Sequence, residues 1–402
     1  MTRTIFSGGA VFDGTGSEPA VGDVVVEDGR FVDVGRGLDG DEQVDLAGKG
    51  VLPGLFDCHT HVTVSSIDLL HNLQTPFSYR FFRAAANLEA TLRSGITSVR
   101  DAGGADLGVK QAVDEGLVNG PRMQISLSMI SQTGGHGDGW MASGEAVRAM
   151  LGAHPGVPET LVDGPDEMRR VVRTLVRMGA DVIKVAVSGG VLSPRDKPRH
   201  AHFRPAELEA LVEEATAAGI WVMAHAQAGD GIKNAVRAGI RSIDHGIYLD
   251  DEAISLMLDR GAWLVPTLVA PRGVIDAAEA GARIPEASLA KAREVVETHA
   301  DSFRRAAAAG VKVAMGTDSG VTPHGHNLRE LELMVAGGMT PAQAMVATTR
   351  SSAELLGVDD ELGTIEPGKR ADLVVVDGDP LDLAGLGDRV TSVYRDGRRV
   401  IG

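Results

Sequence analysis

The segment VLPGLFDCHTH, from Val51 to His61, ends a short apolar run with two histidines that are one residue apart. Side chains of an extended strand alternate between its two faces, so His59 and His61 project to one side while Thr60 points away. Two imidazoles that converge in this way can chelate a metal ion. The segment therefore predicts one part of a metal site, whose other ligands must come from elsewhere in the chain.

The composition predicts a globular protein that acts on a small molecule. Of the 402 residues, 43% are hydrophobic and 23% are charged, which allows one large domain and a smaller one. The net charge of -16 disfavours nucleic acid and anionic membranes as partners. The N-terminus lacks the apolar run of a signal peptide, and no stretch approaches the roughly 20 apolar residues of a membrane span. The single cysteine, Cys58, indicates a cytoplasmic protein and a buried, unreactive thiol.

Both ends of the chain are predicted to form antiparallel strands. Residues 4–46 and the last forty residues contain short β-rich runs with hairpin signals at Asp28-Gly29 and Asp396-Gly397. The region between them has a different pattern. We therefore expect residues 1–53 and 361–402 to form one small β-sandwich domain.

The middle of the chain, residues 54–360, alternates short apolar runs with amphipathic helices. The runs are Leu52–Phe56, Ile96–Arg100, Met123–Leu127, Val182–Ala186, Val222–His225, Ser242–His245, Trp263–Pro266 and Val311–Gly316. The clearest helices are Tyr79–Ser94, Asp166–Met178, Pro205–Ala218 and Pro285–Ala309, each followed by a glycine. Eight such units predict an α/β fold with a (β/α)8 TIM barrel. An open doubly wound sheet is the alternative, although it would normally carry a Gly-rich phosphate loop after its first strand.

Two segments are too long to be simple connectors. Residues 131–165 and 188–203 both follow strands at the end where a barrel carries its active site. We expect both loops to face the substrate.

The later strands supply further candidate ligands at their carboxyl ends. His225 and His245 end the fifth and sixth runs, and Asp318 follows the eighth. Together with His59 and His61, these residues would offer the nitrogen and oxygen ligands that zinc and similar divalent metals use. Five other histidines, in loops or helices, are expected at the surface: His71, His154, His200, His202 and His299.

Lys184 lies inside the apolar fourth run, VIKVAV. Burial disfavours an ammonium, so the pKa of this lysine should fall and the neutral amine should be favoured. A neutral amine can react with carbon dioxide to give a carbamate, whose two oxygens can bridge two cations. A lone lysine at a strand end more often extends to solvent, but the neighbouring candidate ligands favour the metal-bridging role.

The order and strand positions of these residues resemble the amidohydrolase superfamily in its binuclear, carboxylated-lysine form. The resemblance extends to the imidazolonepropionase-like and Xaa-Pro dipeptidase (prolidase-like) branch and covers nearly the whole chain. It is carried by the segments VLPGLFDCHTH, GITSVRDAGG, QTGGHGD, IKVAVSGGV, MGTDSG and GTIEPGKRADLVVVDGDPL.

The resemblance implies a site with two divalent metal ions, with zinc as the expected metal. One metal would be held by His59, His61 and Asp318, and the other by His225 and His245. Carboxylated Lys184 and a nucleophilic hydroxide would bridge them. Asp318 would take the proton and pass it to the leaving nitrogen.

Substrate contacts are expected from the loops and from one unusual residue. The resemblance gives His136 a role in binding or polarising the substrate carbonyl. Gln227 stands where many prolidase-like relatives have a tyrosine, and its amide can donate a similar hydrogen bond. Arg195 and Arg199, with Lys197, could bind a substrate carboxylate, although a solvated basic loop explains them equally well.

Three other polar residues near these motifs have less specific expectations. His324 and His326 either line the pocket or cap the following helix, and Asp101 is expected to be a structural carboxylate near the site.

The expected activity is hydrolysis of an amide C–N bond in Xaa-Pro dipeptides or N-acyl amino acids. Cyclic amides, such as imidazolones or lactams, and esters are alternative substrates for the same metal site. A deaminase is disfavoured by Lys184, and a non-enzymatic scaffold is disfavoured because every ligand is present. The sequence leaves open a homo-oligomer and does not separate zinc from manganese, cobalt or iron.

Overall fold

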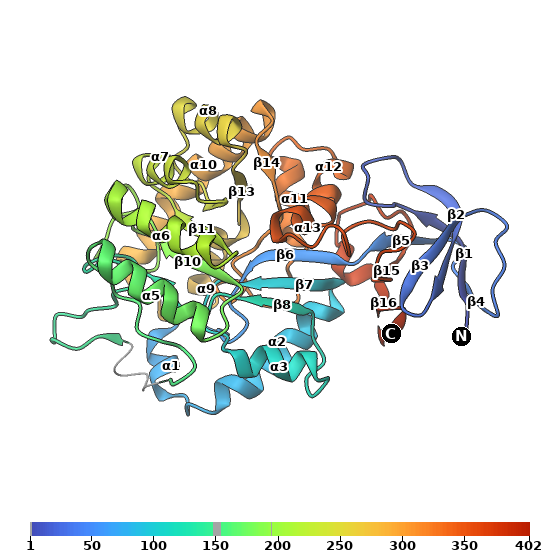
Figure 1. Ribbon diagram of the computed structural model, residues 1–402, viewed down its shortest axis with the longest axis horizontal. Helices are drawn as coiled ribbons and strands as arrows, with labels where there is room; N and C mark the ends of the chain where they lie inside the picture. Colours follow the sequence, from blue (N-terminus) through green and yellow to red (C-terminus); the bar gives the residue numbers. More distant parts are fainter. Residues whose placement is uncertain (1, 148–153, 194) are drawn as a thin grey trace.

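The computed structural model describes residues 2–147, 154–193 and 195–402. The strands and helices of the middle region form one body, and a sheet made from both chain ends lies beside it (Figure 1). The end strands are β1 (Thr4–Val11), β2 (Ala20–Glu27), β3 (Arg30–Gly35), β4 (Glu42–Asp45), β5 (Lys49–Pro53), β15 (Leu373–Asp377), β16 (Val390–Arg395) and β17 (Arg398–Ile401).

The middle region is a parallel barrel surrounded by helices. Its strands are β6 (Leu55–Thr60), β7 (Ile96–Asp101), β8 (Arg122–Ile125), β9 (Met129–Ile130), β10 (Val182–Ala186), β11 (Trp221–Ala226), β12 (Ser242–His245), β13 (Trp263–Val265) and β14 (Lys312–Val313). The helices are α1 (Leu69–Gln74), α2 (Tyr79–Arg93), α3 (Leu107–Asp114), α5 (Pro165–Arg177), α6 (Pro205–Ala217), α7 (Gly229–Ala238), α8 (Asp251–Arg260), α9 (Val269–Glu279), α10 (Glu286–Ala309), α11 (Arg329–Ala336), α12 (Pro341–Ala347) and α13 (Arg350–Leu356).

Hydrogen bonds close the barrel on both sides. Strands β6-β7-β8 form one parallel sheet, and β9 to β14 form another. Strands β8 and β9 share one barrel position, because β10 pairs with β9 while the Asp181 N–H donates to the Ile125 carbonyl of β8 (2.9 Å). On the other side, the Cys58 N–H of β6 donates to the Met315 carbonyl (2.8 Å), just after β14. The predicted (β/α)8 barrel is therefore confirmed.

The first predicted strand, Leu52–Phe56, is wrong in its bounds, because the structure divides it at Gly54. Strand β5 belongs to the end sheet and pairs with β15, whereas β6 belongs to the barrel. A Cβ at Gly54 would lie 2.2 Å from the Thr97 hydroxyl oxygen and 2.7 Å from the Cβ of Asp372. A larger residue would not fit at this crossing, so the glycine lets the chain pass from the end sheet directly into the first barrel strand.

The end sheet joins strands from both termini in the order β17-β16-β15-β5-β1-β2-β3, with β4 also paired to β1. It has a separate apolar core, in which the Phe6 and Tyr394 rings meet edge to face at 4.9 Å. Both predicted hairpin turns are present, with positive φ at Asp28-Gly29 and at Asp396-Gly397. Such turns match the twist of antiparallel strands.

The four clearest helices lie within one residue of their predicted ends, as α2, α5, α6 and α10. Each is followed by a glycine with positive φ, as the sequence predicts. Among the residues described, no helix combines the length and the apolar character that crossing a membrane requires.

A buried carboxylate, Glu330 of α11, gives a prediction about stability and pH. Its two oxygens accept the N–H groups of Leu268 (2.7 Å) and Val269 (2.9 Å) at the start of α9. Burial nevertheless raises its pKa from 4.5 to about 8. Because the folded state then holds the proton more tightly than the unfolded state, this residue lowers the free energy of unfolding as pH rises from about 4.5 to 8, by about 1.4 kcal/mol per unit.

Glu330→Gln should remove this pH dependence. The difference in the free energy of unfolding between the wild type and the variant should therefore change steadily over that pH range. Urea unfolding at pH 5, 6, 7 and 8 measures this difference in the free energy of unfolding. A difference in the free energy of unfolding that stays constant from pH 5 to pH 8 would contradict the prediction.

Candidate active site

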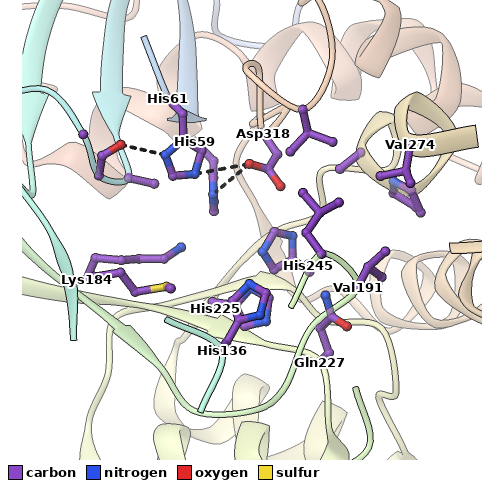
Figure 2. Close-up of a pocket in the computed structure, with 18 of the residues that line it drawn as sticks. His59, His61, His136, Lys184, Val191, His225, Gln227, His245, Val274 and Asp318 are labelled. Carbon is purple, nitrogen blue, oxygen red and sulfur yellow. Dashed lines mark hydrogen bonds and ion pairs between the residues drawn. The ribbon is translucent and has the colours of Figure 1, made fainter. Parts of the chain in front are cut away.

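A cavity of about 340 Å³ lies at the carboxyl ends of the barrel strands (Figure 2). Its polar lining is His59, His61, Ser128, His136, Lys184, His225, Gln227, His245, His299 and Asp318. The structure therefore brings together all six predicted metal-site residues. Both long loops contribute to the wall, through His136 and Val157 from the first and Val191 and Leu192 from the second. Residues 148–153 and 194 of these loops lie outside the described residues.

Three of the predicted ligands meet where β6 lies beside the end of β14. Asp318 Oδ1 lies 3.3 Å from His61 Nε2 and 3.5 Å from His59 Nε2. Burial alone would raise the pKa of Asp318, but the neighbouring histidines hold it well below its usual range. His59, His245 and Asp318 each offer one ligand atom, and these atoms lie within 4.8 Å of one another.

The second ring nitrogen of three histidines is already bonded to protein. The partners are the Asp244 carboxylate for His59 (2.8 Å), the Gly103 carbonyl for His61 (2.8 Å) and the Thr267 hydroxyl for His245 (2.7 Å). In each case Nδ1 makes this bond, which leaves Nε2 as the nitrogen available to a ligand. Metal-binding histidines are oriented in this way, so the residues present fit a divalent cation.

His225 and His245 form a second group of predicted ligands next to the first. The His245 ring lies 4.6 Å from the His225 ring and 5.0 Å from the His59 ring, measured between centroids. His225 Nε2 contacts the Gly189 carbonyl (3.1 Å), which leaves Nδ1 available. Its ring stacks on His136 with 4.1 Å between centroids.

Lys184 is buried, and its only described ion pair joins Nζ to Asp244 Oδ2 (3.2 Å). Burial lowers the pKa of its amine, as the sequence predicts. Asp244 also lies 3.4 Å from the Arg100 guanidinium. Burial favours the neutral form of this aspartate, but the charges of Lys184 and Arg100 outweigh it and hold its pKa well below the usual range.

Sequence reasoning missed Asp244, although it directly precedes His245 in the SIDH motif. It contacts both His59 and Lys184, so it connects a predicted ligand of the first group to the lysine.

The predicted substrate-binding residues divide into two pairs. His136 and Gln227 line the cavity, but Arg195 and Arg199 do not. The Arg195 guanidinium lies over the Trp140 ring (4.9 Å) and that of Arg199 over the Tyr248 ring (4.0 Å). Among the described residues that line the cavity, Lys184 is the only lysine or arginine.

Two histidines that were expected at the surface are buried, so those predictions are wrong. His299 of α10 lines the cavity, and its Nε2 bonds to the His245 carbonyl (2.9 Å). His202 is buried at the end of the second long loop. His71 and His200 are exposed, as predicted.

The remaining predicted polar residues lie outside the cavity. His324 Nε2 contacts the Val64 carbonyl (3.0 Å), and His326 is exposed. Asp101 is the structural carboxylate that the sequence predicts, because it accepts the backbone N–H groups of Val62, Gly103 and Ala105.

Gly190 packs directly against the His136 ring and provides a test of the site's geometry. A Cβ at this position would lie 2.2 Å from His136 Cε1. The ring cannot retreat without losing its stacking on His225, so Gly190→Ala should displace His136 and lower kcat/KM by about tenfold or more. Steady-state kinetics measures this. Gly387→Ala is the matched control, because a Cβ there meets no atom within 4 Å and should change nothing.

A parallel barrel with these groups at the carboxyl ends of its strands has the arrangement of a barrel enzyme, whose active site lies at that end. More specifically, the chain belongs to the amidohydrolase family, whose model matches residues 51–400. It is 35% identical over 365 residues to the ochratoxinase of Aspergillus niger, covering 87% of this chain and 75% of that protein.

Two solved structures are similar along nearly their whole length. One is a Xaa-Pro dipeptidase with methionine bound in its active site, with a TM-score of 0.90, 32% identity and 100% coverage of both chains. The other is a prolidase complexed with N-methylphosphonate-L-proline, with a TM-score of 0.90, 36% identity and 99% coverage of both chains.

Proposed function

We propose that this enzyme uses two divalent metal ions, with zinc expected, to hydrolyse the amide C–N bond of N-acyl amino acids or Xaa-Pro dipeptides. His59, His61 and Asp318 would hold one ion, and His225 and His245 the other. Carboxylated Lys184 would lie between them. When bound, the metals would supply an activated water molecule and polarise the scissile carbonyl.

The observation that carries the proposal is the position of Lys184. Its buried amine extends toward the space between the two groups of ligands (Figure 2). Burying an amine costs free energy, and the ion pair with Asp244 offsets only part of that cost, so its position between two sets of nitrogen and oxygen groups supports a role in the site. It is well suited to carry a bridging carbamate.

The protein's own residues would then move the proton and hold the substrate. Asp318 would accept a proton at its carboxylate and deliver it to the leaving nitrogen. His136 and Gln227 would contact the substrate from the cavity wall.

The character of the cavity favours apolar substituents on the substrate. Much of the wall is formed by Leu127, Met129, Val157, Val191, Leu192, Ile247, Ala270, Pro271, Val274 and Val321. Binding of an apolar group against such a wall is favourable, because it removes apolar surface from water. Because Arg195 and Arg199 lie outside the cavity, we infer that an apolar acyl group or side chain contributes more to binding than a charged carboxylate.

A substrate screen on zinc-loaded protein tests the proposal. It should compare Xaa-Pro dipeptides, N-acyl amino acids, cyclic amides and esters at equal concentrations. We expect the highest kcat/KM for linear amides with bulky apolar groups, and removal of the metal by a chelator should abolish turnover. Turnover confined to cyclic amides or esters would replace the proposed substrate class, and full activity after chelation would exclude the metal role.

A further inference from the structure

The loop that follows β10 forms a chain of polar contacts behind His136. His136 Nδ1 lies 2.8 Å from the Ser193 hydroxyl oxygen. That hydroxyl also contacts Asp196 Oδ1, and it lies 3.2 Å from the Gly190 carbonyl oxygen. The proposed function gives none of these three loop residues a role.

The directions of these hydrogen bonds follow from the protons available. A carboxylate and a carbonyl can only accept hydrogen bonds, and a serine hydroxyl has one proton to donate. Ser193 therefore donates to Asp196 or to Gly190 and faces His136 with a lone pair. His136 Nδ1 must then be the donor in the bond between them. When the ring is neutral, its one proton is therefore on Nδ1, and Nε2 has a free lone pair.

Neighbouring groups hold the Asp196 carboxylate in the position that these hydrogen bonds require. Its side chain is 3% exposed, Oδ2 accepts the Gly190 N–H (3.1 Å), and the Lys291 amine of α10 lies 3.4 Å from Oδ1. Lys291 also donates to the carbonyls of Gly190 (3.0 Å) and Ser193 (2.7 Å). Burial would raise the pKa of Asp196, but the contacts with His136 and Ser193 outweigh it and lower the value to about 2, so the residue is an acceptor at neutral pH.

We propose that Asp196, acting through Ser193 and through its own Oδ2, which lies 3.5 Å from His136 Nδ1, is a positioning residue that holds His136 in the Nδ1–H tautomer and so presents the Nε2 lone pair to the cavity. No described residue forms a hydrogen bond with Nε2, and the ring lines the cavity beside His225. This inference rests on the proposed function for its consequence. A neutral ring of this form accepts a hydrogen bond from a substrate N–H, such as an amide or α-amino group, and cannot polarise the carbonyl through Nε2.

The ring 15N spectrum of histidine-labelled protein tests the tautomer without any substrate. The His136 signals are assigned by their loss in His136→Ala, and the wild type should show a protonated Nδ1 and an unprotonated Nε2. Asp196→Asn should shift the ring toward Nε2–H, because an amide can donate to Ser193 and reverse the chain of bonds. Ser193→Ala should weaken the preference, because only the longer contact of Nδ1 with Asp196 Oδ2 (3.5 Å) then remains. An Nε2–H ring in the wild type, or an unchanged ring in both variants, would overturn the proposal.

A double-mutant cycle tests whether Asp196 acts through His136. Asp196→Asn should lower kcat about tenfold in the wild type with little change in KM, and less than twofold in a His136→Ala background. An equal loss in both backgrounds would indicate a merely structural role and overturn the proposal.

The matched control is Asp138→Asn, in the other long loop. Asp138 accepts the Gly134 N–H (2.7 Å) and makes no described contact with His136. This substitution should leave the His136 spectrum unchanged. Failure to cleave any substrate in the screen would refute the proposed function, whereas the ring spectrum would still decide the tautomer.

Discussion

Lys184→Ala is expected to remove at least one of two bound metal ions and to reduce turnover by about a thousandfold or more. The buried amine lies beside the ligands of both groups, and its carbamate would supply an oxygen to each metal. Alanine has no atom that can replace this bridge. Metal content by mass spectrometry and kcat on the best substrate of the screen measure the two effects. Protein supplied with 13C-bicarbonate should also show a carbamate signal that the variant lacks.

The control for this substitution is Lys110→Ala. Lys110 is also a partly buried lysine in an ion pair, with Asp181 (2.6 Å), but it does not line the cavity. We expect this variant to keep both metals and its turnover. Wild-type metal content and turnover in Lys184→Ala would refute the bridging role.

The alternation of side chains along a strand predicts the direction of some site residues correctly and that of others wrongly. It places His59 and His61 on one side, and both line the cavity. The same rule would place Asp244 and His245 on opposite sides of β12. His245, however, has a positive φ of 72°, which breaks the alternation and lets both side chains take part in the site. Such a backbone turn is rare outside glycine and leaves no pattern in the sequence.

Helical periodicity, by contrast, indicates that His299 is buried. Along α10 the buried residues include Ser288, Ala292, Val295, His299 and Ser302, spaced by three and four. This spacing places His299 on the inner face of the helix, so its burial could have been predicted.

The loop residues could not be placed from sequence. Arg195 and Arg199 lie near cavity-lining residues in the chain, but their side chains stack on Trp140 and Tyr248 instead. In a loop without a repeating pattern, side-chain direction depends on tertiary contacts that the sequence does not reveal. The polar chain from Asp196 to His136 joins two such loops, which explains why only the structure reveals it.

Asp318→Asn is expected to keep most of the metal and yet lower kcat by about a thousandfold. An asparagine oxygen can still contact a cation, and asparagine tolerates the left-handed backbone of this position, where φ is 60°. Its neutral amide cannot take up a proton from water or return one to the leaving nitrogen. The loss should therefore appear in kcat, with the metal content close to that of the wild type.

Asp28→Asn is the matched control, because Asp28 has a similar φ of 50° in a hairpin turn of the end sheet. That variant should retain full turnover, which separates the chemistry of the carboxylate from the effect of the substitution on the backbone. Near-normal turnover in Asp318→Asn would exclude the residue as the base. Loss of metal to the level of Lys184→Ala would instead show that the charge of Asp318 is needed to hold the ion, and the loss of turnover would then be assigned to metal binding.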